Sequence, residues 1–119
     1  MNFKELGKTG LKVSEIGLGK EYLFRESKET TIDVINQAFK YEINYIDILF
    51  TVQNYLEKLA AGIKSDRNQL VITGHLGTKD NKGRPQKTRN IEECKKSFLK
   101  MLDILEIDYV DILNIQLLR

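Results

Sequence analysis

The chain has 119 residues, of which 41% are hydrophobic and 30% charged, and its formal net charge is +2. This length suits a single domain, residues 1–119, and the composition excludes a disordered chain. The small net charge gives no reason to expect nucleic-acid binding, and no apolar run approaches the roughly 20 residues of a membrane-spanning helix. Because the N-terminus is polar and Cys94 is the single cysteine, we expect a cytoplasmic protein without a disulfide or a metal centre.

Short strands are predicted first. Residues 3–19, FKELGKTGLKVSEIGLG, contain two alternating segments around a glycine-bounded turn, which is the pattern of a β-hairpin. A third strand is possible at 16–18. The apolar spacing then becomes helical and predicts a helix over about 28–41, with Ser27 or Thr30 as its N-cap.

Strands and helices alternate after this point. Residues 43–47 form a short β-rich run, and apolar residues from Leu56 to Ile63 recur at the spacing of a second amphipathic helix. Residues 69–73, QLVIT, are almost continuously apolar, as a parallel strand buried on both faces would be. Residues 78–89 contain many charged side chains and the only proline, so we expect a long polar loop there.

A third helix is predicted to begin at Asn90, which forms a variant of the capping box with Glu93. Cys94 shares the apolar face of this helix with Ile91, so we interpret it as a buried small hydrophobe rather than a nucleophile. Residues 109–115 are the last predicted strand. The order, a hairpin followed by β-α-β-α-β-α-β, predicts an α/β fold with four parallel strands flanked by helices.

Functional groups of parallel α/β folds lie where the strands end. Asp47 ends the second strand of the predicted sheet and His75 the third. A carboxylate can fix the tautomer of a histidine, so these residues are candidates for an acid/base or orienting pair. The alternative is that each simply faces a loop or caps a helix. The basic cluster in 78–89 is either a phosphate site or a solvated loop, and Tyr22 stands where a GxGxxG motif needs glycine.

Four segments, ELGKTGLKVSEIGLG, INYID, VITGHLG and DYVDILNI, resemble in order and spacing the N-terminal half of aldo/keto reductases. This resemblance implies part of a TIM barrel and reduction of a small carbonyl substrate with NADPH. GHLG, followed by KTR and a cysteine-bearing helix, is more similar still to a subgroup whose longer members carry a C-terminal iron–sulfur domain. Glu42 replaces a glycine usual in the family, at a cost of about 1 kcal/mol if the position is left-handed.

The resemblance also implies an altered active site. The family uses an aspartate, tyrosine, lysine and histidine tetrad, in which the tyrosine gives a proton to the carbonyl. Asp47 matches the aspartate, but the other three positions hold Val52, His75 and Gln116. Tyr55, three positions beyond the expected tyrosine, should not reach its place from the following helix. His75 is therefore the candidate replacement acid.

The length predicts a half-barrel, because a closed (β/α)8 barrel takes about 250 residues. Its open edges should find a partner, either a second copy, giving a homo-oligomer, or a missing C-terminal half. The resemblance implies that most NADPH contacts lie in that missing half, so the cofactor-binding residues stay unassigned, and we expect neither NADPH binding nor activity of this chain by itself. The alternatives are a non-catalytic self-associating half-barrel module and a flavodoxin-like binder, the latter supported by the alternation alone.

Overall fold

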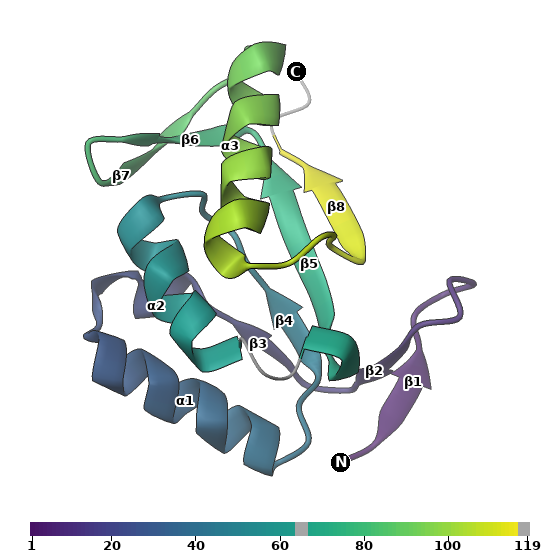
Figure 1. The fold of residues 1–119 in the computed structure, drawn as a ribbon. Helices are drawn as coiled ribbons and strands as arrows, with labels where there is room; N and C mark the ends of the chain where they lie inside the picture. Colours follow the sequence, from purple (N-terminus) through teal and green to yellow (C-terminus); the bar gives the residue numbers. More distant parts are fainter. Residues whose placement is uncertain (64–66, 117–119) are drawn as a thin grey trace.

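A computed structural model describes residues 1–63 and 67–116. Strands β1 (Phe3–Glu5) and β2 (Lys12–Ser14) form an antiparallel hairpin at the N-terminus. In the described part of the chain, four parallel strands make one sheet in the order β3 (Gly17–Gly19), β4 (Tyr45–Asp47), β5 (Val71–Leu76) and β8 (Ile112–Ile115). The predicted α/β fold, with its hairpin and four parallel strands, is confirmed (Figure 1).

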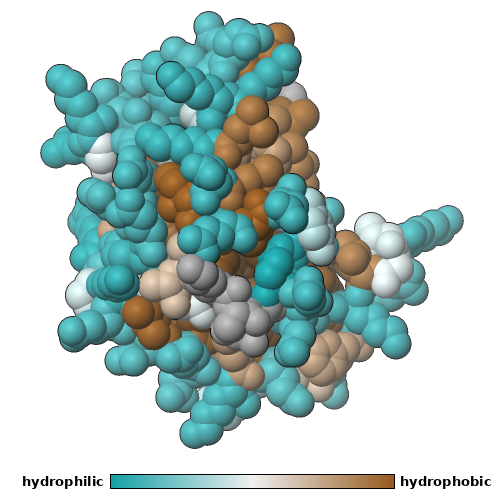
Figure 2. All heavy atoms as spheres, viewed as in Figure 1, coloured by the Kyte–Doolittle hydropathy of each residue, from teal (hydrophilic) through white to brown (hydrophobic). Residues whose placement is uncertain are grey.

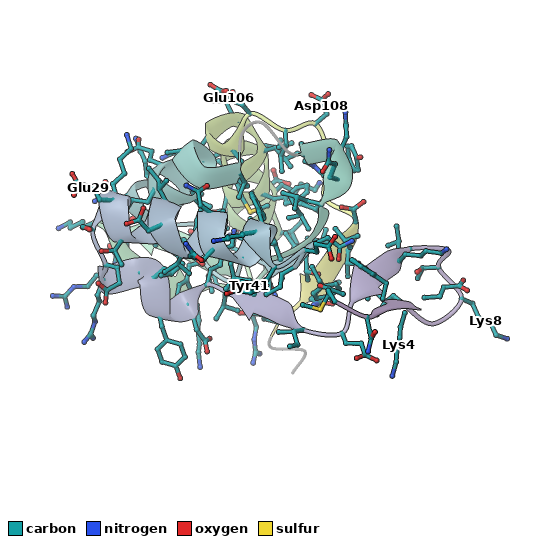
Figure 3. The ribbon with its side chains drawn as sticks, turned by 90° about the horizontal axis from the view of Figure 1, so that it is seen from below. Lys4, Lys8, Glu29, Tyr41, Glu106 and Asp108 are labelled. Atoms are coloured by element: carbon teal, nitrogen blue, oxygen red, sulfur yellow. The ribbon has the colours of Figure 1, made fainter. Side chains whose placement is uncertain are left out.

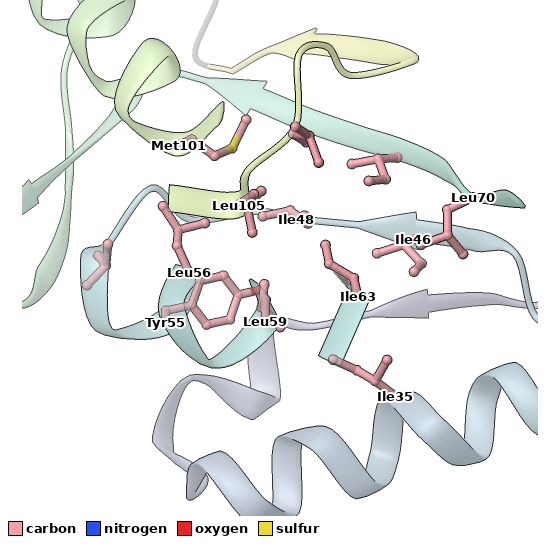
Figure 4. Close-up of a cluster of buried hydrophobic side chains, with 13 residues drawn as sticks. Ile35, Ile46, Ile48, Tyr55, Leu56, Leu59, Ile63, Leu70, Met101 and Leu105 are labelled. Atoms are coloured by element: carbon pink, nitrogen blue, oxygen red, sulfur yellow. The ribbon is translucent and has the colours of Figure 1, made fainter. Parts of the chain in front are cut away.

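Helices α1 (Lys28–Lys40), α2 (Gln53–Ile63) and α3 (Ile91–Leu105) cover one face of this sheet (Figure 1). Alternate strand residues point toward them, and these pack with the apolar stripes of the helices into one core (Figure 4). The fully buried members are Ile35, Ile46, Ile48, Val52, Tyr55, Leu56, Leu59, Ile63, Ile72, Met101 and Leu105. On the other face of the sheet Gly17, Gly19 and Asn114 are exposed. The strand ends therefore present a face that no helix covers.

The N-terminal hairpin is attached to the sheet by Asn44, the residue before β4. Its Oδ1 accepts a hydrogen bond of 2.7 Å from the Ser14 backbone, and its Nδ2 donates one of 3.0 Å to the Lys12 carbonyl. The turn of the hairpin extends away from the sheet, and Lys4 and Lys8 point into solvent (Figure 3).

Residues 78–89 are not the polar loop that was predicted. They contain a second antiparallel hairpin, β6 (Thr78–Asn81) and β7 (Arg84–Lys87), inserted between β5 and α3. The prediction was wrong because lysine, aspartate and asparagine are depleted in strands. The turn itself is well formed, since Lys82 and Gly83 have positive φ angles of 52° and 85°. Two such residues suit the tight turn of a two-residue hairpin.

Both predicted helix caps exist, but the second is incomplete as a capping box. Ser27 Oγ accepts a 3.1 Å hydrogen bond from the Thr30 backbone, and Asn90 Oδ1 accepts one of 3.0 Å from the Glu93 backbone. The Glu93 carboxylate does not return to Asn90. It pairs instead with Lys79 at 2.9 Å and accepts a hydrogen bond from the Thr88 hydroxyl at 2.6 Å. The hydrogen bond from Thr88, followed by that from Lys79, lowers the pKa of the Glu93 carboxyl.

Several finer predictions need correction. Ile91 is 69% exposed rather than part of the buried face of α3, and Cys94 is only half-buried. The third strand of the sheet begins at Val71 and the last at Ile112, two and three residues later than predicted. Just before the last strand, Arg67 contacts the Asp111 carboxylate at 3.1 Å, and the same Asp111 oxygen accepts a hydrogen bond from the Ile72 backbone. The Asp111 backbone in turn donates to the Ile72 carbonyl at 2.9 Å.

Candidate functional site

The site is built by the register of the parallel strands. Gly19 pairs with Asp47 and Asp47 with Thr73, while His75 pairs with Asn114 on the neighbouring strand. Paired residues of adjacent strands point to the same face, so these side chains all lie on the uncovered face of the sheet. The carboxyl ends of β4 and β5 thus bring together the two residues that the sequence indicated.

Asp47 and His75 are in direct contact. His75 Nε2 lies 2.5 Å from Asp47 Oδ1, with 12% of the histidine side chain and 42% of the carboxylate side chain exposed. A hydrogen bond to a carboxylate requires the proton on Nε2. Asp47 therefore selects the tautomer of His75 and fixes the plane of its ring.

Gln116, just after β8, completes the arrangement. Its Nε2 lies 3.2 Å from His75 Nδ1. A neutral ring with its proton on Nε2 has a lone pair on Nδ1, which accepts a hydrogen bond from the amide. One neutral tautomer thus satisfies both contacts. The sequence did not reveal this contact, because Gln116 stood out only as the replacement of a titratable residue.

The position of the family's tyrosine offers no hydroxyl. Val52 is fully buried in the core, and Tyr55 lies on α2 with its ring 5.9 Å from those of Phe24 and Phe50. Burial raises the pKa of the Tyr55 hydroxyl, and the charges of Asp47 and Glu21 raise it further. This side chain is 1% exposed, so it serves packing rather than proton transfer at the open face.

A buried lysine lies at the same rim and was not predicted as a site residue. Lys20 directly follows β3, is 1% exposed, and has no hydrogen-bond partner for Nζ among the described residues. Burial lowers the pKa of its amine to about 7. A lysine placed directly after an apolar strand was the only signal in the sequence.

The described residues do not fit a complete NADPH site. Beside Asp47 there is room, since a Cβ added to Gly19 would meet nothing within 4 Å. However, the cation that follows β3, Lys20, is enclosed and cannot reach a phosphate. The described residues also hold no group of His, Cys, Asp and Glu suited to a metal, and none of their helices is long and apolar enough to cross a membrane.

Comparisons with known proteins give a family match and several similar solved structures. A search of the curated proteins found no match. Among solved structures, the chain is similar to a proposed aldo-keto reductase from Pseudomonas aeruginosa, with a TM-score of 0.80 and 25% identity over 95% of this chain. It also shares the fold of an aldo-keto reductase from Bacillus halodurans in its holo form, with a TM-score of 0.83 and 19% identity over 97% of the chain. A glycerol dehydrogenase from Gluconobacter oxydans gives a TM-score of 0.75 and 16% identity over 95% of the chain.

The chain spans 45%, 40% and 38% of the length of these three proteins, respectively. It therefore corresponds to less than half of each relative. The aldo/keto reductase family profile matches residues 15–117, which includes every strand and helix of the sheet layer. This chain belongs to the aldo/keto reductase family.

Proposed function

We propose that this chain supplies the proton-transfer half of a carbonyl reductase site, which a complementary half-barrel completes. The observation that carries the proposal is the 2.5 Å contact between Asp47 and His75 at the strand ends. In this reading His75 takes over the acid role that the family gives to tyrosine. Asp47 orients the ring, as a carboxylate does for other catalytic histidines.

The proton step follows from the two contacts of the ring. A doubly protonated His75 keeps its Nε2 proton on Asp47 and gives its Nδ1 proton to the carbonyl oxygen as negative charge develops there. The ring becomes neutral, and its Nδ1 lone pair then accepts the Gln116 amide. The observed contacts, at 2.5 and 3.2 Å, correspond to the state after proton release. For the substrate to approach, Gln116 has to leave Nδ1.

The hydride donor would be NADPH, as in the family, held by residues outside this chain. Because the cation that directly follows β3, Lys20, is enclosed, we expect no saturable NADPH binding and no turnover by the chain alone. Activity therefore requires a C-terminal half-barrel as the partner. Two narrower proposals are added. The GHLG segment at 74–77 favours membership of the iron–sulfur subgroup, and the single cysteine, Cys94, favours a reducing, cytoplasmic setting.

A chimaera tests the reductase proposal. Residues 1–116 would replace the matching segment of the Pseudomonas aeruginosa protein, and NADPH oxidation would be followed with 4-nitrobenzaldehyde as substrate. We expect reduction that His75→Gln and Asp47→Asn each lower by about a hundredfold or more, with NADPH binding unchanged. A chimaera that binds NADPH but reduces no aldehyde, or whose rate survives His75→Gln, contradicts the proposal.

A self-associating, non-catalytic module is the second candidate, favoured by the edge strands. Neither β3 (Gly17–Gly19) nor β8 (Ile112–Ile115) contains a charge or a proline, the usual protection of sheet edges. Leu113 and Ile115 are 40% and 60% exposed, and Figure 2 shows hydrophobic atoms gathered beside α3 over β5 and β8. Light scattering after size separation tests this candidate: a discrete dimer that Asp47→Asn leaves intact supports it, and a monomer excludes it.

A further inference from the structure

We propose that a cleft beside the strand ends binds an aromatic carboxylate. The cleft, called the rim cleft below, lies between the 3-10 helix η1 (Glu21–Arg25) and the tip of the β6–β7 hairpin. Its volume is about 790 Å³, within the range of small-molecule sites. The residues that matter for recognition are Tyr22, Phe24, Arg25, Phe50 and Arg84, with Glu21 at its edge.

Aromatic rings form one side of the rim cleft. Phe24 and Phe50 meet edge to face at 5.7 Å, and both pack against the buried ring of Tyr55 at 5.9 Å. Tyr22 is 84% exposed, an unusual exposure for a large aromatic side chain. Rings fixed in this way offer stacked and edge-to-face contacts to a planar ligand.

Two arginines supply the charge. Neither the Arg25 nor the Arg84 guanidinium has a hydrogen-bond or ion-pair partner in the part of the chain that the structure describes. A free guanidinium matches the planar fork of a carboxylate. Glu21, the one acidic residue of the described lining, repels additional negative charge. The described lining therefore carries one net positive charge, which a single carboxylate neutralises.

Both walls of the rim cleft are fastened to α2. Lys58 Nζ donates to the backbone carbonyls of η1 and its end, at 3.3 Å to Leu23, 2.9 Å to Phe24 and 2.7 Å to Glu26. On the other side Asp80 accepts hydrogen bonds from the backbone of Gln53, at 3.1 Å, and of Gly83, at 2.7 Å. Because the same helix holds both walls, the cleft exists before any ligand arrives, which reduces the ordering entropy of binding.

The rim cleft adjoins the proposed reductase site. Glu21 follows β3, Phe50 follows β4 and Arg84 comes from the hairpin after β5, so three strand-end connections line it. A role for the rim cleft in substrate binding rests on the proposed function. With that function, the substrates are aromatic carbonyl compounds that carry a carboxylate.

Binding can be tested without NADPH or turnover, so its failure and that of the reductase proposal are distinguishable. The probe is 1-naphthoate, titrated into the whole chain and followed by saturation-transfer NMR and calorimetry. Neutral 1-naphthalenemethanol and non-aromatic cyclohexanecarboxylate are the matched ligands. We expect saturable binding of naphthoate, at least about tenfold tighter than either matched ligand, because each lacks one of the two recognised groups.

Arg25→Gln and Arg84→Gln should each weaken naphthoate binding about tenfold, the effect of one lost hydrogen bond to a charged group. Arg89→Gln is the control, because it makes the same change at an exposed residue outside the cleft lining. This variant should bind naphthoate as tightly as the wild type does. Absence of saturable binding, equal binding of cyclohexanecarboxylate, or arginine variants that bind normally would overturn the proposal. Tighter binding of adenosine 2′-phosphate than of naphthoate would overturn it too, by assigning the cleft to a nucleotide.

Discussion

Replacing Lys20 with methionine should stabilise the chain at and below neutral pH. The lysine is 1% exposed, its amine has no partner among the described residues, and burial lowers the pKa of that amine from 10.5 to about 7. This difference corresponds to about 5 kcal/mol, at about 1.36 kcal/mol for each factor of ten. Charging the enclosed amine therefore lowers the stability of the folded chain by a free energy of this order. Methionine has nearly the same shape and carries no charge.

The sign of the pH dependence follows from the two protonation states. Below pH 7 the amine is protonated in the folded and the unfolded chain, so the free energy of unfolding does not depend on pH through this group. Between pH 7 and 10.5 the unfolded chain holds a proton that the folded chain lacks, and stability rises with pH. From pH 7 to pH 9 this rise should be about 2 kcal/mol for the wild type. Lys20→Met should show no such rise.

Urea unfolding followed by far-UV circular dichroism between pH 6 and pH 9.5 measures this slope. The range stops below pH 10 because the raised pKa of the Tyr55 hydroxyl lowers stability at higher pH, where the unfolded chain gives up that proton first. Lys8→Met removes a charge from the exposed hairpin turn (Figure 3) and should keep the wild-type slope. A wild type without the rise, or a Lys20→Met variant that retains it, would refute the reasoning.

Three further predictions concern single contacts. The chain has one histidine, so its ¹⁵N NMR signals at pH 9 should report a proton on Nε2 of His75 and none on Nδ1. The Nδ1 resonance should shift in Gln116→Leu, which removes the amide donor. A proton on Nδ1 would contradict the assigned hydrogen bonds. Glu42 has a φ of 62°, and Glu42→Gly should raise the free energy of unfolding by about 1 kcal/mol in urea titrations, whereas a loss of stability would show that the position is not strained. The side chains of Arg67 and Asp111 are 13% and 12% exposed, so Asp111→Ala should lower the free energy of unfolding by about 3 kcal/mol; a loss below about 1 kcal/mol would mean that solvent screens the pair.

Helices and the main strands were predictable because they depend on local pattern. The apolar spacing of α1, α2 and α3 follows from 3.6 residues per turn, and Ser27 and Asn90 can satisfy free backbone N–H groups wherever a helix begins. The strained Glu42 was also visible, since a side chain replaced the family's glycine there. The β6–β7 hairpin was not, because its stability comes from a turn at Lys82 and Gly83 and from contacts with α2 rather than from strand-forming residues.

Sequence by itself determined the chain order of the parallel strands and their helices and the family, and it indicated Asp47 and His75 at two strand ends, because strand ends and motifs are local features of the chain. Tertiary structure alone decided three things. It placed Gln116 on His75 across 41 residues, enclosed the Lys20 amine beneath a layer of packed side chains, and set the arginines of η1 and of the β6–β7 hairpin on opposite sides of one cleft. Each depends on segments distant in sequence meeting at one rim of the sheet, and no spacing along the chain encodes such a distance.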